Sequence, residues 1–446
     1  MTSLHRQDRR ERYGGAFPAK CFLLLLLLLA AEPASAASLL PGGYFKSLNL
    51  YAESPPQNGF SDGEVSSNQL RLDLTGTLPG DLDFQFSAEN VFLYTHPAGL
   101  VPLPRNQVNR VLNLEKSWSE GAPFSDKLFI DRLNIMASFS GTDLTIGRQA
   151  IGFGRIVLFS PLDVIAPFPP EALDTDVRPG VDALRAVHYF GLGGQAGAVA
   201  VFGNQRRNSS YLGTFSYNVA GIDLLALSGW LRDRPMGGIG LAGSLSGLGL
   251  KGEIAAYGGK DVGKPGGDLY DTFAIGALES WYRFDNGLVL LTEYLYNGPG
   301  TNSPERYPEV AESAPLREGL TYLLGRHYLL AGPSYEVNPL VTLEGLLIWN
   351  LTDDSFLLRP LADISLSDNL VLQLFWSWHH GRKPRTLPGE AIVVPRSEFG
   401  SFGDTGGALW RVFGFGSFSF CWNLGKSPGA REENRRMESF HEERAL

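Results

Sequence analysis

Residues 340–351 read LVTLEGLLIWNL, a stretch in which apolar and polar side chains alternate. One face carries Val341, Leu343, Gly345, Leu347, Trp349 and Leu351, and the other carries Thr342, Glu344 and Asn350. Leu346 and Ile348 interrupt the polar face. Because successive side chains of a strand point to opposite faces, this period of two predicts a β-strand with one apolar and one mixed face.

The same period recurs along the chain, for example over residues 70–75, 82–89 and 370–378. No stripe with the 3.6-residue period of a helix appears before residue 430. Turn residues separate the alternating stretches and predict about 18 strands. The strands are expected near residues 44–52, 68–77, 82–93, 127–139, 142–151, 181–190, 194–202, 210–219, 222–232, 236–245, 247–257, 271–284, 287–296, 321–335, 340–351, 355–366, 369–380 and 407–423.

The connections between these strands alternate in length. Tight turns are expected near residues 79–80, 140–141, 191–193, 220–221, 246, 285–286, 338–339 and 367–368. Longer loops are expected over residues 53–67, 94–126, 152–180, 203–209, 258–270, 297–320 and 381–406, with weaker members near 233 and 353. Short turns on one membrane face and long loops on the other are typical of a transmembrane barrel.

The pattern therefore predicts an all-β fold, a transmembrane antiparallel up-and-down β-barrel of about 18 strands (roughly 16 to 18), with short periplasmic turns and long external loops. A sheet can cross a bilayer only if it closes on itself, because lipid satisfies no backbone hydrogen bonds. The alternative is a soluble propeller or tandem sandwich. Such folds do not require alternating connections, and a repeat of about 20 to 50 residues would be expected of them.

The composition fits this prediction. The 446 residues are 43% apolar and 19% charged, with a formal net charge of -9. After the N-terminus no run approaches the roughly 20 apolar residues of a transmembrane helix. The two cysteines exclude a disulfide scaffold, and the acidic balance offers no basic surface for nucleic acid.

The N-terminus has the parts of a secretory signal peptide. Basic residues precede the apolar run 21–31, and Ala34-Ser35-Ala36 supplies a small-residue cleavage site. We expect a signal peptide over residues 1–36, an outer-membrane barrel over 37–424 and a charged periplasmic tail over 425–446. A bacterial outer-membrane location follows from export combined with a barrel.

No sequence signature of an enzyme is present. The chain lacks a nucleophile elbow, a His-Glu-x-x-His motif and a phosphate-binding loop. It also lacks Cys-x-x-Cys-His, so it attaches no c-type haem itself. We therefore predict that the protein is not an enzyme, and we predict no catalytic, cofactor-binding or metal-binding residues.

The most unusual segment is GRQAIGFGRIVLFSPLDVIAPFPPEALDTDVRPGVDALR, residues 147–185. Five prolines prevent regular strand pairing across its middle. Its apolar residues are better placed against the barrel wall or in the mouth than in water, which predicts a pore constriction over residues 152–180. The charged residues expected there are Arg148, Arg155, Asp163, Glu171, Asp174, Asp176, Arg178 and Arg185. An ordinary external loop held by ion pairs is the alternative.

Strand parity predicts which other charged residues face the lumen. Arg148 shares parity with the apolar Leu144 and Ile146, so placing it inside requires a local flip, such as a bulge at Gly147 or Gly152. A charged side chain facing lipid costs roughly 2–4 kcal/mol at the midplane. The predicted lumen residues are Glu89, Arg132, Lys251, Glu253 and Glu344, with Asn134 and Thr342 beside them. Both signs occur, so ion selectivity stays open, although the acidic balance favours cations.

The chain as a whole resembles the outer-membrane porins in its pattern. Residues 147–149 (GRQ) through 178–185 (RPGVDALR) resemble a segment of the porin-like barrels that sheathe multihaem cytochromes in extracellular electron transfer. One departure is the polar tail after the last predicted strand, because porin-like chains typically end at an aromatic residue. The resemblance implies a conduit, with outer-membrane lipid as its surroundings.

Two functions follow as expectations. The first is an outer-membrane channel for passive passage of small solutes or ions, with residues 152–180 as its constriction. The alternative is a barrel that sheathes a cytochrome and thereby carries electrons across the membrane, with periplasmic or extracellular multihaem cytochromes as partners. An outer-membrane hydrolase would need a Ser, a His and an acidic residue brought together by the fold, and no spacing indicates one.

Overall fold

The computed structural model describes residues 38–52, 63–96, 108–118, 123–170, 172, 174–191, 193–382, 385–386, 393–394 and 410–423. The signal peptide predicted over residues 1–36 and the tail predicted over 425–446 lie outside these ranges. Most of the stretch predicted to form the barrel lies within them.

Eighteen long strands form one antiparallel wall. They are β1 (Ser38–Ala52), β2 (Gly63–Leu78), β3 (Leu82–His96), β5 (Phe124–Phe139), β6 (Thr142–Gln149), β7 (Val181–Phe190), β8 (Gly194–Val201), β9 (Ser210–Val219), β10 (Ile222–Leu231), β11 (Arg234–Leu245), β12 (Leu248–Gly258), β13 (Thr272–Arg283), β14 (Val289–Asn297), β15 (His327–Asn338), β16 (Val341–Asn350), β17 (Ser355–Ser367), β18 (Leu370–His380) and β21 (Trp410–Asn423).

The other elements are short. They are β4 (Glu115–Trp118), which pairs with β5, the pair β19 (Arg385–Thr386) and β20 (Val393–Val394), the 3-10 turns η1 (Arg206–Asn208) and η2 (Pro304–Arg306), and the helices α2 (Tyr307–Ala311) and α3 (Ala314–Arg317). None of the helices in the described ranges has the length and apolar character needed to cross a membrane.

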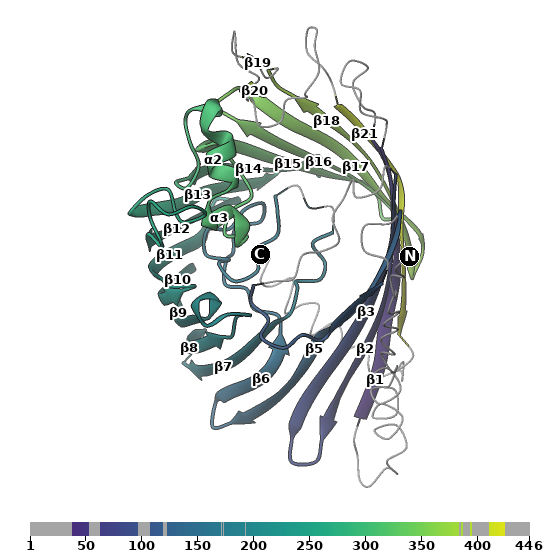
Figure 1. The fold of residues 1–446 in the computed structure, drawn as a ribbon. Helices are drawn as coiled ribbons and strands as arrows, with labels where there is room; N and C mark the ends of the chain where they lie inside the picture. Colours follow the sequence, from purple (N-terminus) through teal and green to yellow (C-terminus); the bar gives the residue numbers. More distant parts are fainter. Residues whose placement is uncertain are drawn as a thin grey trace, which may run out of the picture.

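Strand pairing runs around a ring (Figure 1). Each wall strand from β1 to β17 pairs with the next wall strand in sequence, and β21 pairs with both β18 and β1. Phe420 of β21 is aligned with Phe45 of β1 on one side and with Leu370 of β18 on the other. Pairing on both sides satisfies the backbone polar groups that an open edge would leave free. The predicted antiparallel up-and-down barrel is confirmed.

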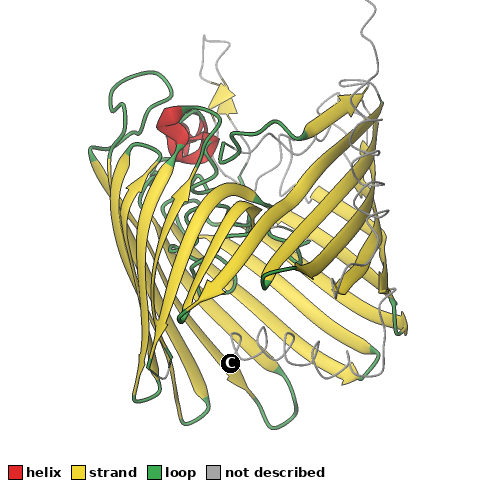
Figure 2. Ribbon diagram, turned by 90° about the horizontal axis from the view of Figure 1, so that it is seen from below, coloured by secondary structure: helices red, strands yellow, loops and turns green. Residues whose placement is uncertain are grey.

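The two ends of the barrel differ in their connections (Figure 2). At one end tight turns such as Ser140-Gly141 and Ala220-Gly221 join the strands, with positive φ at both positions, as two-residue hairpin turns require. The longer connections, with α2 and α3, lie at the other end. This alternation agrees with the sequence prediction.

Several connections differ from the prediction. β2 begins at Gly63, inside the loop predicted over residues 53–67, and β15 begins at His327 rather than near 321. The link near residue 233 is a tight turn, because Arg232 and Asp233 both adopt positive φ (49° and 64°) directly between β10 and β11. The loop predicted over residues 94–126 was wrong in part, since it contains β4 and the ends of β3 and β5. β4 is too short, at four residues, for an alternation to identify it in the sequence.

The wall exposes large apolar side chains on its outside. Leu278 of β13 and Ile239 of β11 are 66% and 59% exposed, whereas their inward-facing neighbours Ala277 and Gly240 are buried. Exposed apolar surface on this scale is unfavourable in water and favourable against acyl chains. The outside of the barrel is thus suited to lipid.

The inside is occupied by the chain between β6 and β7. We call residues 150–180 the lumen segment; within the ring, its trace crosses the space enclosed by the strands (Figure 1). Ile151, Ile156, Phe159, Leu162 and Ile165 of this segment are buried, and they form one cluster with inward-facing apolar residues of β7 to β17. Burial of each large apolar side chain contributes roughly 1.5–3 kcal/mol. The lumen segment therefore packs against one side of the barrel interior.

Candidate functional site

The lumen segment leaves the wall at the end of β6, where Gly147 makes a turn that other residues rarely adopt. Its φ is +116°, and a Cβ at this position would lie 2.2 Å from the carbonyl oxygen of Leu133. This conformation turns Arg148 away from the apolar face predicted by its parity, so that it is 2% exposed. Its guanidinium donates to Asp182 at 2.7 and 3.1 Å and to the carbonyl oxygens of Ile130 and Leu112. The flip that the sequence analysis required lies at Gly147.

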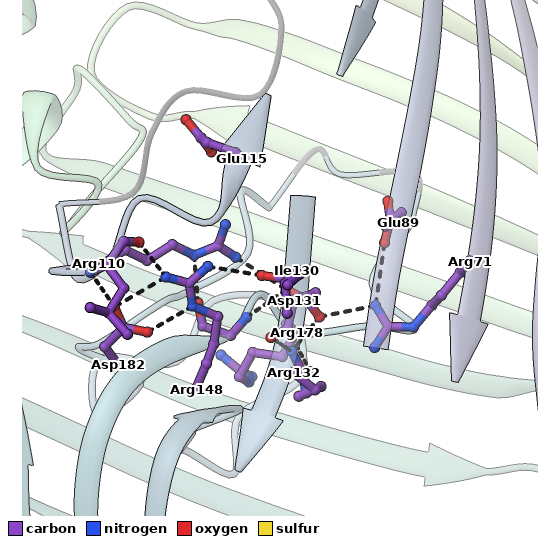
Figure 3. Close-up of polar contacts among 12 residues, drawn as sticks. Arg71, Glu89, Arg110, Glu115, Ile130, Asp131, Arg132, Arg148, Arg178 and Asp182 are labelled. Carbon is purple, nitrogen blue, oxygen red and sulfur yellow. Dashed lines mark hydrogen bonds and ion pairs between the residues drawn. The ribbon is translucent and has the colours of Figure 1, made fainter. Parts of the chain in front are cut away.

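A β-bulge in β5 turns Asp131 into the lumen. Ser87 is aligned with Arg132 and Ala88 with Ile130, so Asp131 is the extra residue between them. Its carboxylate binds Arg71 at 2.9 Å, Arg110 at 3.1 Å and the backbone N–H of Gly180 at 2.9 Å, and it also binds Arg132 (Figure 3). This acid therefore joins β2, β5, the connection before β4 and the end of the lumen segment.

The second half of the lumen segment is held by arginines. Arg132 donates to the carbonyl oxygen of Arg178, and Arg178 in turn binds Asp163 and the carbonyl oxygen of Ala166. The guanidinium of Arg178 also lies over the ring of Phe168, 5.0 Å from its centre. Burial raises the pKa of Asp163 to about 6, despite the opposing effect of Arg178.

Three glutamates on adjacent strands bind the first half of the segment. Glu253, Glu279 and Glu293 lie on β12, β13 and β14, and Glu279 and Glu293 are directly aligned. The backbone N–H groups that donate to them are those of Arg155 (2.6 Å), Ile156 (3.3 Å) and Leu162 (3.3 Å) to Glu253, Val157 (2.6 Å) to Glu279 and Phe159 (3.2 Å) to Glu293. A buried irregular backbone needs such acceptors, because its N–H groups have no strand or helix partner.

The tip of the segment and its first turn bind the wall at two further points. Lys46 of β1 donates to Asp174 at 2.9 Å and to Asp176 at 2.8 Å, across 128 and 130 residues of sequence. Arg155 lies 2.8 Å from Asp223 of β10. Both contacts include side chains that are partly exposed to the remaining lumen.

The residues predicted for the constriction are thus mostly bound to the wall. Asp163 and Arg178 bind each other, whereas Arg148, Arg155, Asp174 and Asp176 bind partners outside the predicted set. Arg185 lies on β7, half-buried, and Glu171 lies outside the described residues. These charged residues therefore act as separate anchors of the lumen segment.

The residues predicted for the lumen lie on four different strands. Glu89 accepts a hydrogen bond from Arg71 at 3.3 Å, Arg132 binds Asp131, Lys251 lies 3.0 Å from Glu279, and Glu253 binds the lumen segment. Glu344 is exposed on β16. Asn134 donates to the carbonyl oxygen of Arg148.

Sequence reasoning missed several residues of this site, namely Lys46, Arg71, Asp131, Asp182, Glu279 and Glu293. Parity applied to every predicted strand would have identified Arg71, Glu279 and Glu293, because each shares a face with inward residues. Asp131 is different, since a bulge shifts parity and leaves no mark in the alternation. The partners of Lys46 are too distant in sequence for any local signal.

Within the part of the chain that the structure describes, no three His, Cys, Asp or Glu side chains are placed to hold a metal ion. The arrangement is that of a segment inside the ring of strands that buried ion pairs and backbone hydrogen bonds tether to the wall.

Comparisons with known proteins support the fold. No family model matches the chain, and no curated protein matches it in sequence. Among solved structures, the chain is similar to OccAB4 of Acinetobacter baumannii, with a TM-score of 0.54 and 10% identity over 88% of this chain and 100% of that one. OccAB2 of the same organism aligns with a TM-score of 0.54 and 10% identity over 87% and 98% of the two chains.

OccD3 (OpdP) of Pseudomonas aeruginosa aligns with a TM-score of 0.50 and 11% identity over 87% of this chain and 94% of that one. At this identity the likeness shows a shared fold. A barrel paired around a ring, with an apolar exterior, crosses a bilayer. The fold thus places the chain in a bacterial outer membrane, as predicted.

Proposed function

We propose that the protein is a passive outer-membrane channel for small hydrophilic solutes or ions, with the lumen segment as its constriction. The observation that carries the proposal is the way in which this segment is held. Its apolar residues pack against the wall from β7 onward, and its tip is bound to β1 on another part of the ring. We infer that this tethered segment narrows the passage, and Asp176 at its tip keeps 75% of its side chain exposed to solvent.

The geometry also argues against the alternative, a barrel that sheathes a multihaem cytochrome. Such a partner would need the space that the lumen segment and its buried apolar cluster fill. Charged anchors at both ends of the segment oppose its displacement. Small solutes and the surrounding lipid are therefore the partners we propose, and we expect no enzymatic activity.

Single-channel recording tests the proposal. The purified full-length protein, added to planar lipid bilayers in KCl solution, is expected to produce ohmic current steps of uniform size. Bilayers that stay silent while a folded preparation is present would contradict the channel. Haem that co-purifies with the barrel would instead support the sheath.

A further inference from the structure

The charged groups that stay accessible near the lumen segment are mainly acidic. Basic side chains around the lumen segment are buried and bound: Arg71, Arg132, Arg148 and Lys46 keep between 2% and 10% of their side chains exposed, and each is bound to at least one carboxylate. A passing anion would have to break these buried pairs to reach them. Such breaking leaves an unpaired buried charge, which costs several kcal/mol.

The acidic groups divide into two sets: Asp131, Asp182 and the three glutamates that bind the segment are buried, whereas others are accessible. The side chains of Asp176 and Asp223 are 75% and 45% exposed. The more accessible basic residues, Arg155 and Arg178, are 28% and 25% exposed, and each is bound to an acidic partner. In the pairs Lys46–Asp176 and Arg155–Asp223 the carboxylate is the more exposed partner, so a solute meets mainly negative charge at these two places.

Two further acids extend this surface along the wall. Asp363 of β17 is aligned with Thr342 of β16, two residues from Glu344 on the same neighbouring strand, and the charge of Asp363 interacts with that of Asp176. Gln373 donates to Asp363 at 3.0 Å. Among the side chains that the structure describes, no basic group lies within ion-pair distance of Asp363 or Glu344. We call Asp176, Asp363 and Glu344 the acidic edge.

From this distribution we infer that the channel conducts cations in preference to anions, and that the acidic edge produces the preference. The inference rests on the proposed function and adds the charge class of the solute. A passage with low-dielectric walls and charge of one sign concentrates counter-ions along its path. The cation preference arises from the summed electrostatic field of all charges in the lumen, and no cation-binding site is implied. Lys46 acts as a positioning residue, because it holds Asp174 and Asp176 at the edge of the passage.

Reversal potentials test the inference. The full-length protein in planar bilayers, with a tenfold KCl gradient, is expected to show a reversal potential of the sign that K⁺ preference requires. The triple variant Asp176→Asn, Asp363→Asn, Glu344→Gln should shift the potential strongly toward zero while conductance persists. Asp285→Asn is the matched control, because it removes an exposed acid from the tight turn between β13 and β14.

The outcomes separate the two proposals. Silent bilayers from folded wild-type protein would contradict the channel itself. A conducting wild-type protein with a potential of zero or of the anion-selective sign would overturn the inference and leave the channel in place. A cation preference that the triple variant retains in full would overturn the role of the acidic edge. Lys46→Met gives an independent check, since release of the tip should change both conductance and reversal potential.

Discussion

Arg148 and Asp182 form a buried ion pair at the two points where the chain leaves and rejoins the barrel wall, with Nε and Oδ1 2.7 Å apart. Arg148 lies at the end of β6 and Asp182 at the start of β7. Asp182 also accepts the backbone N–H of Leu112, so the pair binds the connection before β4 as well. This ion pair therefore joins the two ends of the lumen segment at one place on the barrel wall.

Removal of one partner of the Arg148–Asp182 ion pair should destabilise the protein. Arg148→Met leaves the carboxylate of Asp182 buried without its charge partner, for which a loss of about 3–5 kcal/mol is expected. The measurement is the free energy of unfolding in urea with lipid vesicles. The control is Arg306→Met, which breaks an exposed pair with Glu309 and should change stability by no more than about 1 kcal/mol. Equal losses of unfolding free energy in the two variants would show that the Arg148–Asp182 pair stabilises the protein no more than an exposed pair does.

Gly147→Ala should be more costly than most glycine substitutions in the wall. Its φ of +116° disfavours a side chain, and the added Cβ would meet the carbonyl oxygen of Leu133. We expect a loss of at least about 1–3 kcal/mol, measured as above. Gly213→Ala is the control, because the nearest atom to its added Cβ lies 3.9 Å away. If both variants unfold at the same urea concentration, the strained turn at Gly147 is not required.

Glu253→Gln should loosen the first half of the lumen segment. The glutamate accepts backbone N–H groups of Arg155, Ile156 and Leu162, and the amide of glutamine offers one acceptor oxygen in place of two. Hydrogen exchange of peptides that cover residues 151–166 should become faster, whereas peptides of β1 to β3 should keep their rate. Glu336→Gln, an exposed position near the β15–β16 turn, serves as the control. Unchanged protection in Glu253→Gln would remove this glutamate from the anchor.

The sequence predicted the wall strands and the faces on which some of their charged residues lie. The alternation over residues 340–351 predicted β16, which runs from Val341 to Asn350, and similar patterns predicted the other wall strands. The same parity placed Glu253 and Lys251 with the polar residues of their strand. These strand predictions succeed because the two-residue period is a local property, which lipid outside and water inside impose on every strand.

The contacts that hold the lumen segment could not be predicted from local sequence patterns. Lys46 meets Asp174 across 128 residues, and Asp131 faces inward because of a bulge in β5. Nothing near either residue in the sequence distinguishes it from a surface charge. The apolar residues of the lumen segment did indicate burial, but their partners depend on the arrangement of the whole ring.

The stability of the protein should depend on pH through Asp163. Its pKa is about 6 in the folded protein, above the roughly 3.9 expected for the unfolded chain, so the folded state binds the proton more tightly. Its contribution to stability is therefore fully present below about pH 3.9 and is lost as the pH rises to about 6. Asp163→Asn removes this group, and its unfolding midpoint should fall less than that of the wild type across this range. Parallel curves for the two proteins would show that Asp163 titrates normally.

Blockage by a thiol reagent tests most directly whether the edge of the lumen segment faces the conducting passage. In a background in which Cys21 and Cys421 are replaced by serine, Asp176→Cys places one thiol at the tip of the segment, and Asp285→Cys places one in the tight turn between β13 and β14. A bulky methanethiosulfonate added to open channels should lower the single-channel current in one irreversible step for Asp176→Cys and leave it unchanged for Asp285→Cys. An unchanged current in Asp176→Cys, with labelling of the thiol verified by mass, would contradict a passage along the lumen segment.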